Sequence, residues 1–162
     1  MKIIPLEELA EHLDRLKADG KKIVHCHGCF DLMHPGHIKY FQAAKKMGDV
    51  LVVTVTSDRY VDKGPGRPVF SDVLRAESIA ALQCVDFVSI NNYSTAEETL
   101  RLLKPHYYVK GQEFEKLEDK TGKILKEYAM AEDLGVKVCF THEIVFSSTQ
   151  LLNKHFFLST ED

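Results

Sequence analysis

The sequence predicts an α/β fold in which a doubly wound, parallel, five-stranded sheet carries helices on both faces. Short apolar stretches alternate along the chain with longer segments of helical periodicity, which is the pattern of strand–helix–strand units. The segment Val50 to Val55 is almost continuously apolar, as expected for a strand that is covered on both sides. Connections between parallel strands are right-handed, so successive helices are divided between the two faces.

The first half of the chain supplies three helices and two strands. Leucines recur three or four residues apart from Leu6 to Leu16 and predict a helix that Gly20 ends. Asp62 to Pro68 is too rich in glycine and proline for a helix or a strand and is expected to be a loop. The remaining elements expected here are a strand at 22–27, a helix at 37–47, a strand at 50–55 and a helix at 72–83.

The second half supplies three more strands and three more helices. Ser94 to Glu97 has the spacing of a capping box and predicts the start of a helix that ends near Lys104. Gly135 is expected to end another helix, and Ser147 to begin the last one. The other bounds expected are strands at 85–90, 107–110 and 136–141, and a helix at 123–134.

Composition excludes several classes of function. With 162 residues the chain is expected to form a single domain, 1–162. A formal net charge of -3 gives no electrostatic basis for binding nucleic acid, and no apolar run is long enough to span a bilayer. The four cysteines are scattered among apolar neighbours, which is typical of buried reduced thiols in a cytoplasmic protein.

The segment from Gly28 to His37 leads from the first strand into a helix and indicates a phosphate site. The first N–H groups of a helix lack partners within it and favour an anion. Pro35 suits the start of a helix, and Gly36 permits close approach of the backbone. His34 and His37 are therefore expected to meet a phosphate group, whereas the alternative is a purely local role at the helix end.

Other polar residues follow later strands and should meet the same edge of the sheet. Lys63 and Arg67 are suited to phosphates, although such loop residues are often only solvated surface charges. Lys110 ends a strand where an apolar residue is the default. Arg75 either contacts a substrate or forms an ion pair with Asp72. Three consecutive hydroxyls, Ser147-Ser148-Thr149, are expected to cradle phosphate, with a simple helix cap as the alternative.

A metal site is an alternative interpretation of part of this segment, because His25, Cys26, His27 and Cys29 lie close together. However, no second Cys/His pair follows at the spacing of a zinc site. In a strand, Cys26 also points away from His25 and His27. We therefore expect a buried cysteine at position 26 and no protein-bound metal, although the sequence alone leaves this cluster open.

The motif Gly28-x-Phe30-Asp31-x-x-His34-x-Gly36-His37 resembles the signature of the cytidylyltransferase-like nucleotidyltransferases. The chain is most similar to the nucleotidyltransferase domain of ADP-heptose synthases and is also related to glycerol-3-phosphate cytidylyltransferases. The loop from Lys63 to Pro68 and the segments Arg75-Ala76-Glu77, Tyr108-Val109-Lys110-Gly111 and Ser147-Ser148-Thr149 resemble further motifs of that family. The resemblance implies a Rossmann-like fold.

The resemblance also implies roles for individual residues. His34, His37 and Lys63 would act in catalysis. The acceptor would meet the side chain or backbone of Lys63, Arg75, Lys110 and Gly111. The nucleotide would be bound by Gly28, Cys29, Phe30, Asp31, Gly36, Arg67, Ser147, Ser148 and Thr149.

The activity implied is transfer of NMP from an NTP, with ATP favoured, to a sugar phosphate, with Mg²⁺ accompanying the nucleotide. A homodimer is expected. In the family this domain is often fused to a sugar kinase, so the chain is either a separate domain or one domain of such a fusion. In a fusion, the tail from His155 to Asp162 would begin a linker. Glycerol-3-phosphate cytidylyltransferases carry an arginine where this chain has His142-Glu143-Ile144-Val145, and Cys26 and His27 replace the usual threonine-asparagine of heptose enzymes. The alternatives are a CTP-dependent enzyme for a small polyol phosphate and a nucleotide-binding module without catalysis.

Overall fold

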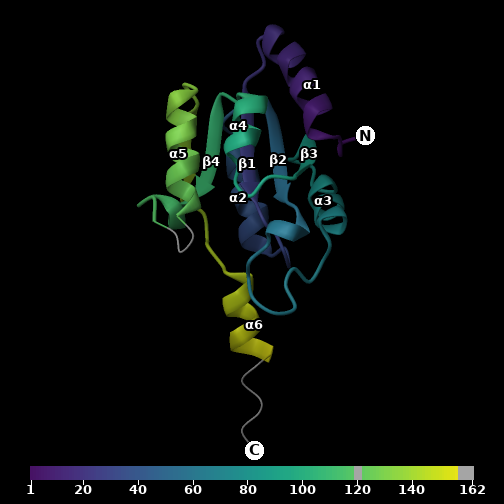
Figure 1. The fold of residues 1–162 in the computed structure, drawn as a ribbon, viewed down its shortest axis with the longest axis vertical. Helices are drawn as coiled ribbons and strands as arrows, with labels where there is room; N and C mark the ends of the chain where they lie inside the picture. Colours follow the sequence, from purple (N-terminus) through teal and green to yellow (C-terminus); the bar gives the residue numbers. More distant parts are fainter. Residues whose placement is uncertain (119–121, 157–162) are drawn as a thin grey trace, which may run out of the picture.

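The computed structural model describes residues 1–118 and 122–156 and has a parallel, five-stranded sheet at its centre. The strand order is β3-β2-β1-β4-β5 (Figure 1). The strands are β1 (Ile23–Gly28), β2 (Val50–Thr56), β3 (Phe87–Asn91), β4 (Tyr107–Gly111) and β5 (Lys137–Thr141). The helices are α1 (Leu6–Ala18), α2 (Pro35–Lys45), α3 (Asp72–Ala80), α4 (Glu97–Leu103), α5 (Lys123–Asp133) and α6 (Ser148–Phe156), with short 3-10 helices η1 (Asp58–Tyr60) and η2 (Gln112–Phe114).

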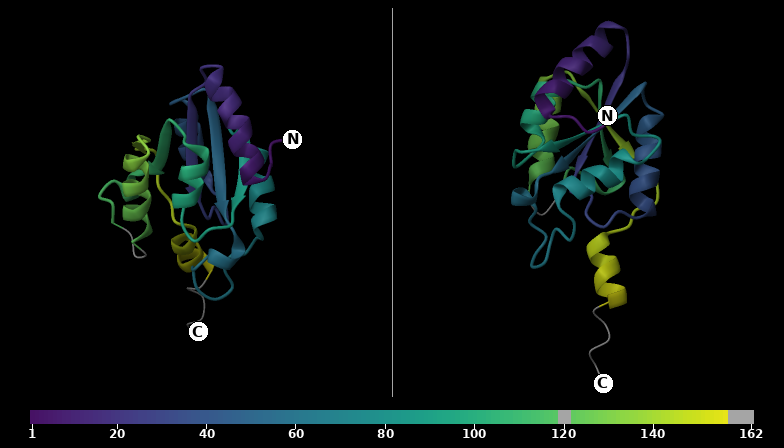
Figure 2. Two further views of the ribbon diagram at one scale, coloured as in Figure 1. Left: turned by 45° about the horizontal axis from the view of Figure 1, so that its top comes forward. Right: turned by 90° about the vertical axis from the view of Figure 1, so that its right-hand side faces the viewer.

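Helices cover both faces of the sheet, which confirms the predicted doubly wound α/β architecture. On one face, Phe41 of α2 and Ile79 of α3 pack on Val24 and Val53. On the other face, α1 packs on β1 and β2, and α4 and α5 pack around Tyr108. α6 projects beyond the carboxyl edge of the sheet (Figure 2). None of the described helices is long and apolar enough to cross a membrane.

The chain reverses its winding direction between β1 and β4, which are neighbours in the sheet but far apart in sequence. Their register ends at the pair Cys26–Val109, although β1 continues alongside β2 to Gly28 and β4 continues alongside β5 to Gly111. The ends of β1 and β4 therefore separate at the carboxyl edge. Ligands bind at such a point in α/β sheets, because the loops that follow the two strands turn away from each other.

Several predicted boundaries were wrong. The capping box at Ser94 is absent, since α4 begins after Ala96 and the loop before it is held by Asn91, whose side chain bonds Tyr93, Thr95 and Thr99. α2 begins two residues early, at Pro35, whereas α3 ends early, at Ala80. Most of the tail in which a linker was expected lies outside the described residues.

Candidate active site

A cavity of about 460 Å³ lies at the carboxyl edge of the sheet, where β1 and β4 separate. Its walls come from the segment after β1, the loop after β2 and the segments after β4 and β5. Of the predicted site residues, it is lined by Gly28, Cys29, Phe30, His34, Gly36, His37, Lys63, Lys110, Gly111, Ser147 and Ser148. The structure thus brings most of the predicted residues to one cavity of a size suited to a small-molecule ligand.

The two histidines of the motif lie against each other at the start of α2. His34 is the N-cap residue, and its ring stacks on that of His37 with 3.8 Å between the ring centroids and 20° between the planes. The backbone N–H of His34 donates to Nδ1 of His37 (3.3 Å), so a neutral His37 carries its proton on Nε2. Both ring nitrogens of His34 are buried without a hydrogen-bond partner among the described residues.

Burial disfavours the charged form of both rings. Burial, together with electrostatic interaction with the His34 ring and with the ammonium of Lys63, lowers the pKa of His37 to about 4. Burial also lowers the pKa of His34 below its usual value. A triphosphate in the cavity would supply negative charge and acceptor oxygens, both of which favour protonated imidazoles. Binding of an anion by this pair stays a prediction.

Gly36 allows the segment after β5 to approach these histidines. A Cβ atom at this position would lie 3.0 Å from the His34 ring and 3.1 Å from the carbonyl oxygen of Ile144. Phe146 meets the edge of the His34 ring, with 5.7 Å between centroids. The glycine is thus explained by close packing over the histidines rather than by an unusual backbone conformation.

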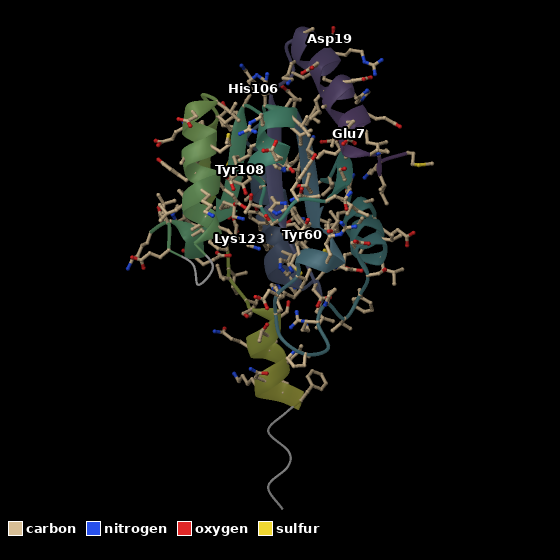
Figure 3. The ribbon with its side chains drawn as sticks, in the orientation of Figure 1. Glu7, Asp19, Tyr60, His106, Tyr108 and Lys123 are labelled. Atoms are coloured by element: carbon tan, nitrogen blue, oxygen red, sulfur yellow. The ribbon has the colours of Figure 1, made fainter. Side chains whose placement is uncertain are left out.

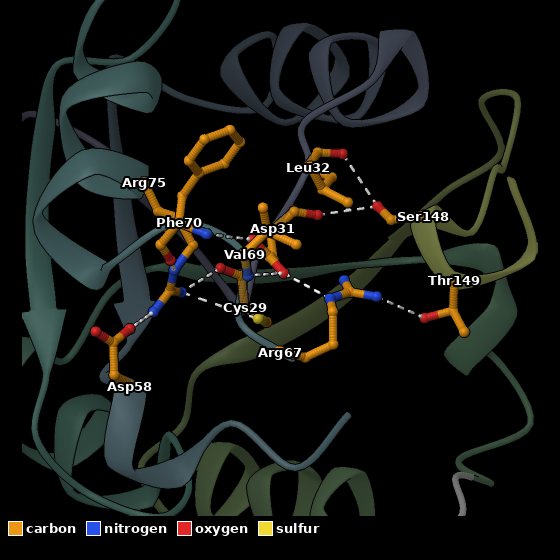
Figure 4. Close-up of polar contacts among 10 residues, drawn as sticks. All are labelled: Cys29, Asp31, Leu32, Asp58, Arg67, Val69, Phe70, Arg75, Ser148 and Thr149. Atoms are coloured by element: carbon orange, nitrogen blue, oxygen red, sulfur yellow. Dashed lines mark hydrogen bonds and ion pairs between the residues drawn. The ribbon is translucent and has the colours of Figure 1, made fainter. Parts of the chain in front are cut away.

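A buried ion pair ties the loop after β2 to the motif (Figure 4). Nε of Arg67 donates to Asp31 (2.7 Å), and the N–H groups of Val69 and Phe70 donate to the same carboxylate. Burial alone would raise the pKa of Asp31, but the hydrogen bonds from Val69, Arg67 and Phe70 hold it below its usual value. This contact fixes the loop that carries Lys63.

The same ion pair is connected to the first turn of α6. Arg67 donates to the hydroxyl of Thr149 (3.2 Å), and the hydroxyl of Ser148 donates to the carbonyl oxygens of Asp31 and Leu32. In contrast to the sequence expectation, Asp31, Arg67 and Thr149 are not brought to the cavity wall, because they bond one another. Their geometry positions other residues instead of presenting polar atoms to a nucleotide.

Arg75 is also held away from the cavity. Its side chain is 1% exposed and donates to the carbonyl oxygens of Phe70, Cys29 and Thr56 and to the carboxylate of Asp58. Among the described residues its ion pair is with Asp58 and not with Asp72, which was the alternative. The guanidinium joins the segment after β1 to the end of β2.

The hydroxyls after β5 have more than one role. Ser147 Oγ accepts from the N–H of Gln150 (3.3 Å), which is the capping role that was the alternative to a phosphate cradle. Ser147 and Ser148 nevertheless line the cavity. Binding of phosphate by these residues stays a prediction.

The cluster considered as a metal site is divided between the two faces of β1. His25 and His27 both bond the hydroxyl of Thr54, at 2.8 and 2.9 Å, and burial lowers the pKa of both rings, that of His27 to about 3. Cys26 is fully buried on the opposite face, as predicted. Within 1–118 and 122–156, no three His, Cys, Asp or Glu side chains lie together as a metal site would require.

Several residues of the cavity wall were not predicted from the sequence. Tyr40 lies one turn after His37 on the same face of α2, and this spacing was the available signal. Glu113 and Phe114 belong to η2, which follows β4. Glu143 and Gln150 flank the serines, and no pattern distinguishes them from surface residues.

The chain is similar in sequence to known proteins. Residues 25–154 match the family model described as cytidylyltransferase-like. The chain is 38% identical over 139 residues to the bifunctional protein HldE of Desulfatibacillum aliphaticivorans, covering 85% of this chain and 27% of that protein. It is 46% identical over 115 residues to HldE of Geobacter metallireducens, covering 70% and 24%. The chain thus spans about a quarter of the length of these relatives.

Solved structures show the same fold. The lipopolysaccharide core biosynthesis protein of Thermoplasma volcanium superposes with a TM-score of 0.64 and 27% identity, over 78% of this chain and all of that one. Pantothenate synthetase of Thermus thermophilus superposes with a TM-score of 0.60 over 87% of this chain and 61% of that one. At 14% identity, the second likeness shows the fold alone.

Proposed function

The chain belongs to the cytidylyltransferase-like family of nucleotidyltransferases, and we propose that it transfers NMP from an NTP to a small sugar phosphate, releasing pyrophosphate. One observation carries the proposal: the stacked His34–His37 pair faces a cavity into which lysines from two other segments also reach. Relatives named HldE and a structural neighbour named for lipopolysaccharide core biosynthesis support a sugar phosphate as the acceptor.

The chemistry needs charge stabilisation and positioning more than proton transfer. An oxygen of the acceptor phosphate attacks the α-phosphorus, a new P–O bond forms, and the bond to the bridging oxygen of pyrophosphate breaks. The attacking oxygen is already anionic at neutral pH, so no general base is required. His34, His37 and Lys63 would bind the charge that develops on the α-phosphate and the leaving group, and Lys110 would hold the acceptor.

Mg²⁺ is part of the proposal, as a companion of the nucleotide. Glu113 and Glu143 line the cavity and offer the hard oxygen ligands that this ion prefers, alongside phosphate oxygens and water. Bound there, the ion would neutralise charge on the pyrophosphate. We also propose ATP as the donor, a homodimeric assembly and a cytoplasmic location.

The proposal is tested by incubating the protein with Mg²⁺, each of the four NTPs and a panel of phosphorylated acceptors while pyrophosphate is measured. Release with ATP and a sugar phosphate is the expected result. Release only with CTP and a polyol phosphate would replace the donor and the acceptor of the proposal. Nucleotide binding in a thermal-shift screen without release of pyrophosphate, under all conditions, would identify a binding module and refute the enzymatic proposal.

A further inference from the structure

A buried ionic contact lies behind the cavity wall at Lys110. The side chain is 9% exposed, and its ammonium donates to the carbonyl oxygen of His27 (3.1 Å). The same nitrogen lies 4.7 Å from the centroid of the Phe114 ring and 3.9 Å from a carboxylate oxygen of Glu127. Lys110 thus lines the cavity, while the carboxylate of Glu127 in the protein interior balances its charge.

Glu127 belongs to the buried face of α5, next to Ile124 and Ala131, where an apolar residue is the default. Its side chain is 5% exposed. The hydroxyl of Tyr108 donates to one oxygen (2.7 Å), and the N–H of Ala96 donates to the other (3.1 Å). Tyr108, labelled in Figure 3, packs with Leu100 of α4 and Ala131 of α5. The carboxylate, which is itself on α5, is therefore held by β4 and by the residue that precedes α4.

Lys110 needs such an anchor because of its place in the sheet. It lies past Val109, the last residue of β4 in register with β1, so on that side its ammonium bonds the carbonyl oxygen of His27 but its backbone is not paired with β1. A lysine side chain has several rotatable bonds and loses rotamer entropy when it is held in one position. A fixed carboxylate on the interior side limits the ammonium to positions at the cavity wall.

We propose that Glu127 is a positioning residue that holds the Lys110 ammonium where the phosphate of the acceptor binds. This inference rests on the proposed function, because it assigns the phosphate met by Lys110 to the acceptor. Glu127 itself lies behind Lys110 and does not touch the substrate. Its removal therefore affects acceptor binding and leaves nucleotide binding unchanged.

The Glu127→Gln variant tests this inference, because it removes the charge at nearly constant volume. We expect the KM for the acceptor to rise about tenfold and the KM for the NTP to stay within twofold. Glu98→Gln is the matched control: it removes the charge of a glutamate that is 45% exposed and pairs with Arg101, so it should leave the acceptor KM within twofold. An equal rise of both KM values in Glu127→Gln, an unchanged acceptor KM, or the same effect in Glu98→Gln would overturn the inference.

A second comparison shows whether the effect passes through Lys110. The variant Lys110→Gln/Glu127→Gln leaves no unpaired charge in the interior and should fold even if Glu127→Gln alone does not. If Glu127 acts only through Lys110, this double variant has the acceptor KM of Lys110→Gln alone, within twofold. A larger difference between the two would contradict the proposed route.

Binding of inorganic phosphate separates this inference from the proposed function. Calorimetric titration is done with the nucleotide side filled by a non-hydrolysable analogue of the NTP that binds in the thermal-shift screen. Glu127→Gln should weaken phosphate binding about tenfold, and unchanged affinity would refute the positioning role. If the wild-type protein releases no pyrophosphate with any acceptor, the proposed function fails, yet this titration still decides the role of Glu127.

Discussion

Arg67→Ala is expected to destabilise the protein strongly, although Arg67 belongs to a glycine-rich surface loop. The side chains of Arg67 and Asp31 are 7% and 0% exposed, and their contact is a charge-assisted hydrogen bond of 2.7 Å. Removing one partner of a buried ion pair costs about 3–5 kcal/mol, because the other charge stays buried with less compensation, in this case the N–H groups of Val69 and Phe70. At about 2–4 °C per kcal/mol for a domain of this size, the melting temperature should fall by roughly 6–20 °C.

Thermal denaturation followed by circular dichroism measures this change, and Arg101→Ala provides the control. Arg101 forms an ion pair of the same length with Glu98, but the two side chains are 52% and 45% exposed. Exposed pairs contribute about 0–1 kcal/mol, so this variant should melt within about 3 °C of the wild type. Equal melting temperatures for the two variants would refute the view that the buried pair holds the loop.

Acidification gives an independent check on the same pair. Because hydrogen bonds hold the pKa of Asp31 below its usual value, its contribution to stability is present above the pKa of the unfolded chain, about 4. It is lost as the pH falls through the lower pKa of the folded state. Arg67→Ala should therefore lose less stability than the wild type on acidification from pH 5 to pH 2.

Three further outcomes follow from the site. His37→Ala should lower the rate of pyrophosphate release about 10²-fold or more while the circular dichroism spectrum is unchanged, and near-normal turnover would remove His37 from the mechanism. The pKa of His37 is about 4 in the folded protein and about 6.5 in the unfolded chain, so its burial makes the protein less stable as the pH falls. In urea titrations, the free energy of unfolding of the wild type should fall between pH 7 and pH 4.5 by about 2–3 kcal/mol more than that of His37→Ala. Equal losses in the two proteins would contradict the burial of a neutral ring. Gly36→Ala should cost about 1–3 kcal/mol in the same titrations and raise the KM for the NTP, because its Cβ would press on His34 and Ile144, whereas wild-type values would show that the segment moves freely.

The architecture was predictable because it depends on patterns that are local in the sequence. The apolar run at Val50–Val55 and the leucine spacing from Leu6 to Leu16 each specify an element, and the handedness of the connections then leaves few arrangements. The start of α4 was not predictable in the same way. Asn91 organises the preceding loop through four hydrogen bonds that no capping pattern indicates.

The candidate site was predictable where function and fold use the same segment. His34, His37 and Gly36 lie at a helix start, and their spacing places them together. The roles of Arg67 and Arg75 could not be predicted from the sequence, because a cationic side chain near a phosphate site can turn toward the ligand or toward the protein. That direction depends on partners distant in sequence, such as Asp31 and Asp58, which become neighbours only in the folded chain.

The separation of β1 and β4 beyond Cys26 and Val109 divides the protein into two regions that differ in how well they tolerate amino-acid substitutions. Up to that pair, the side chains of β1 and β4 are mostly buried, so substituting them loses packing and destabilises the fold. Past it, residues such as Ile144 and Val145 line the cavity with exposed side chains, so the width of the entrance and its chemical preference can be altered there with little consequence for the rest of the fold. An effort to change which acceptor this protein takes should begin with those outer positions.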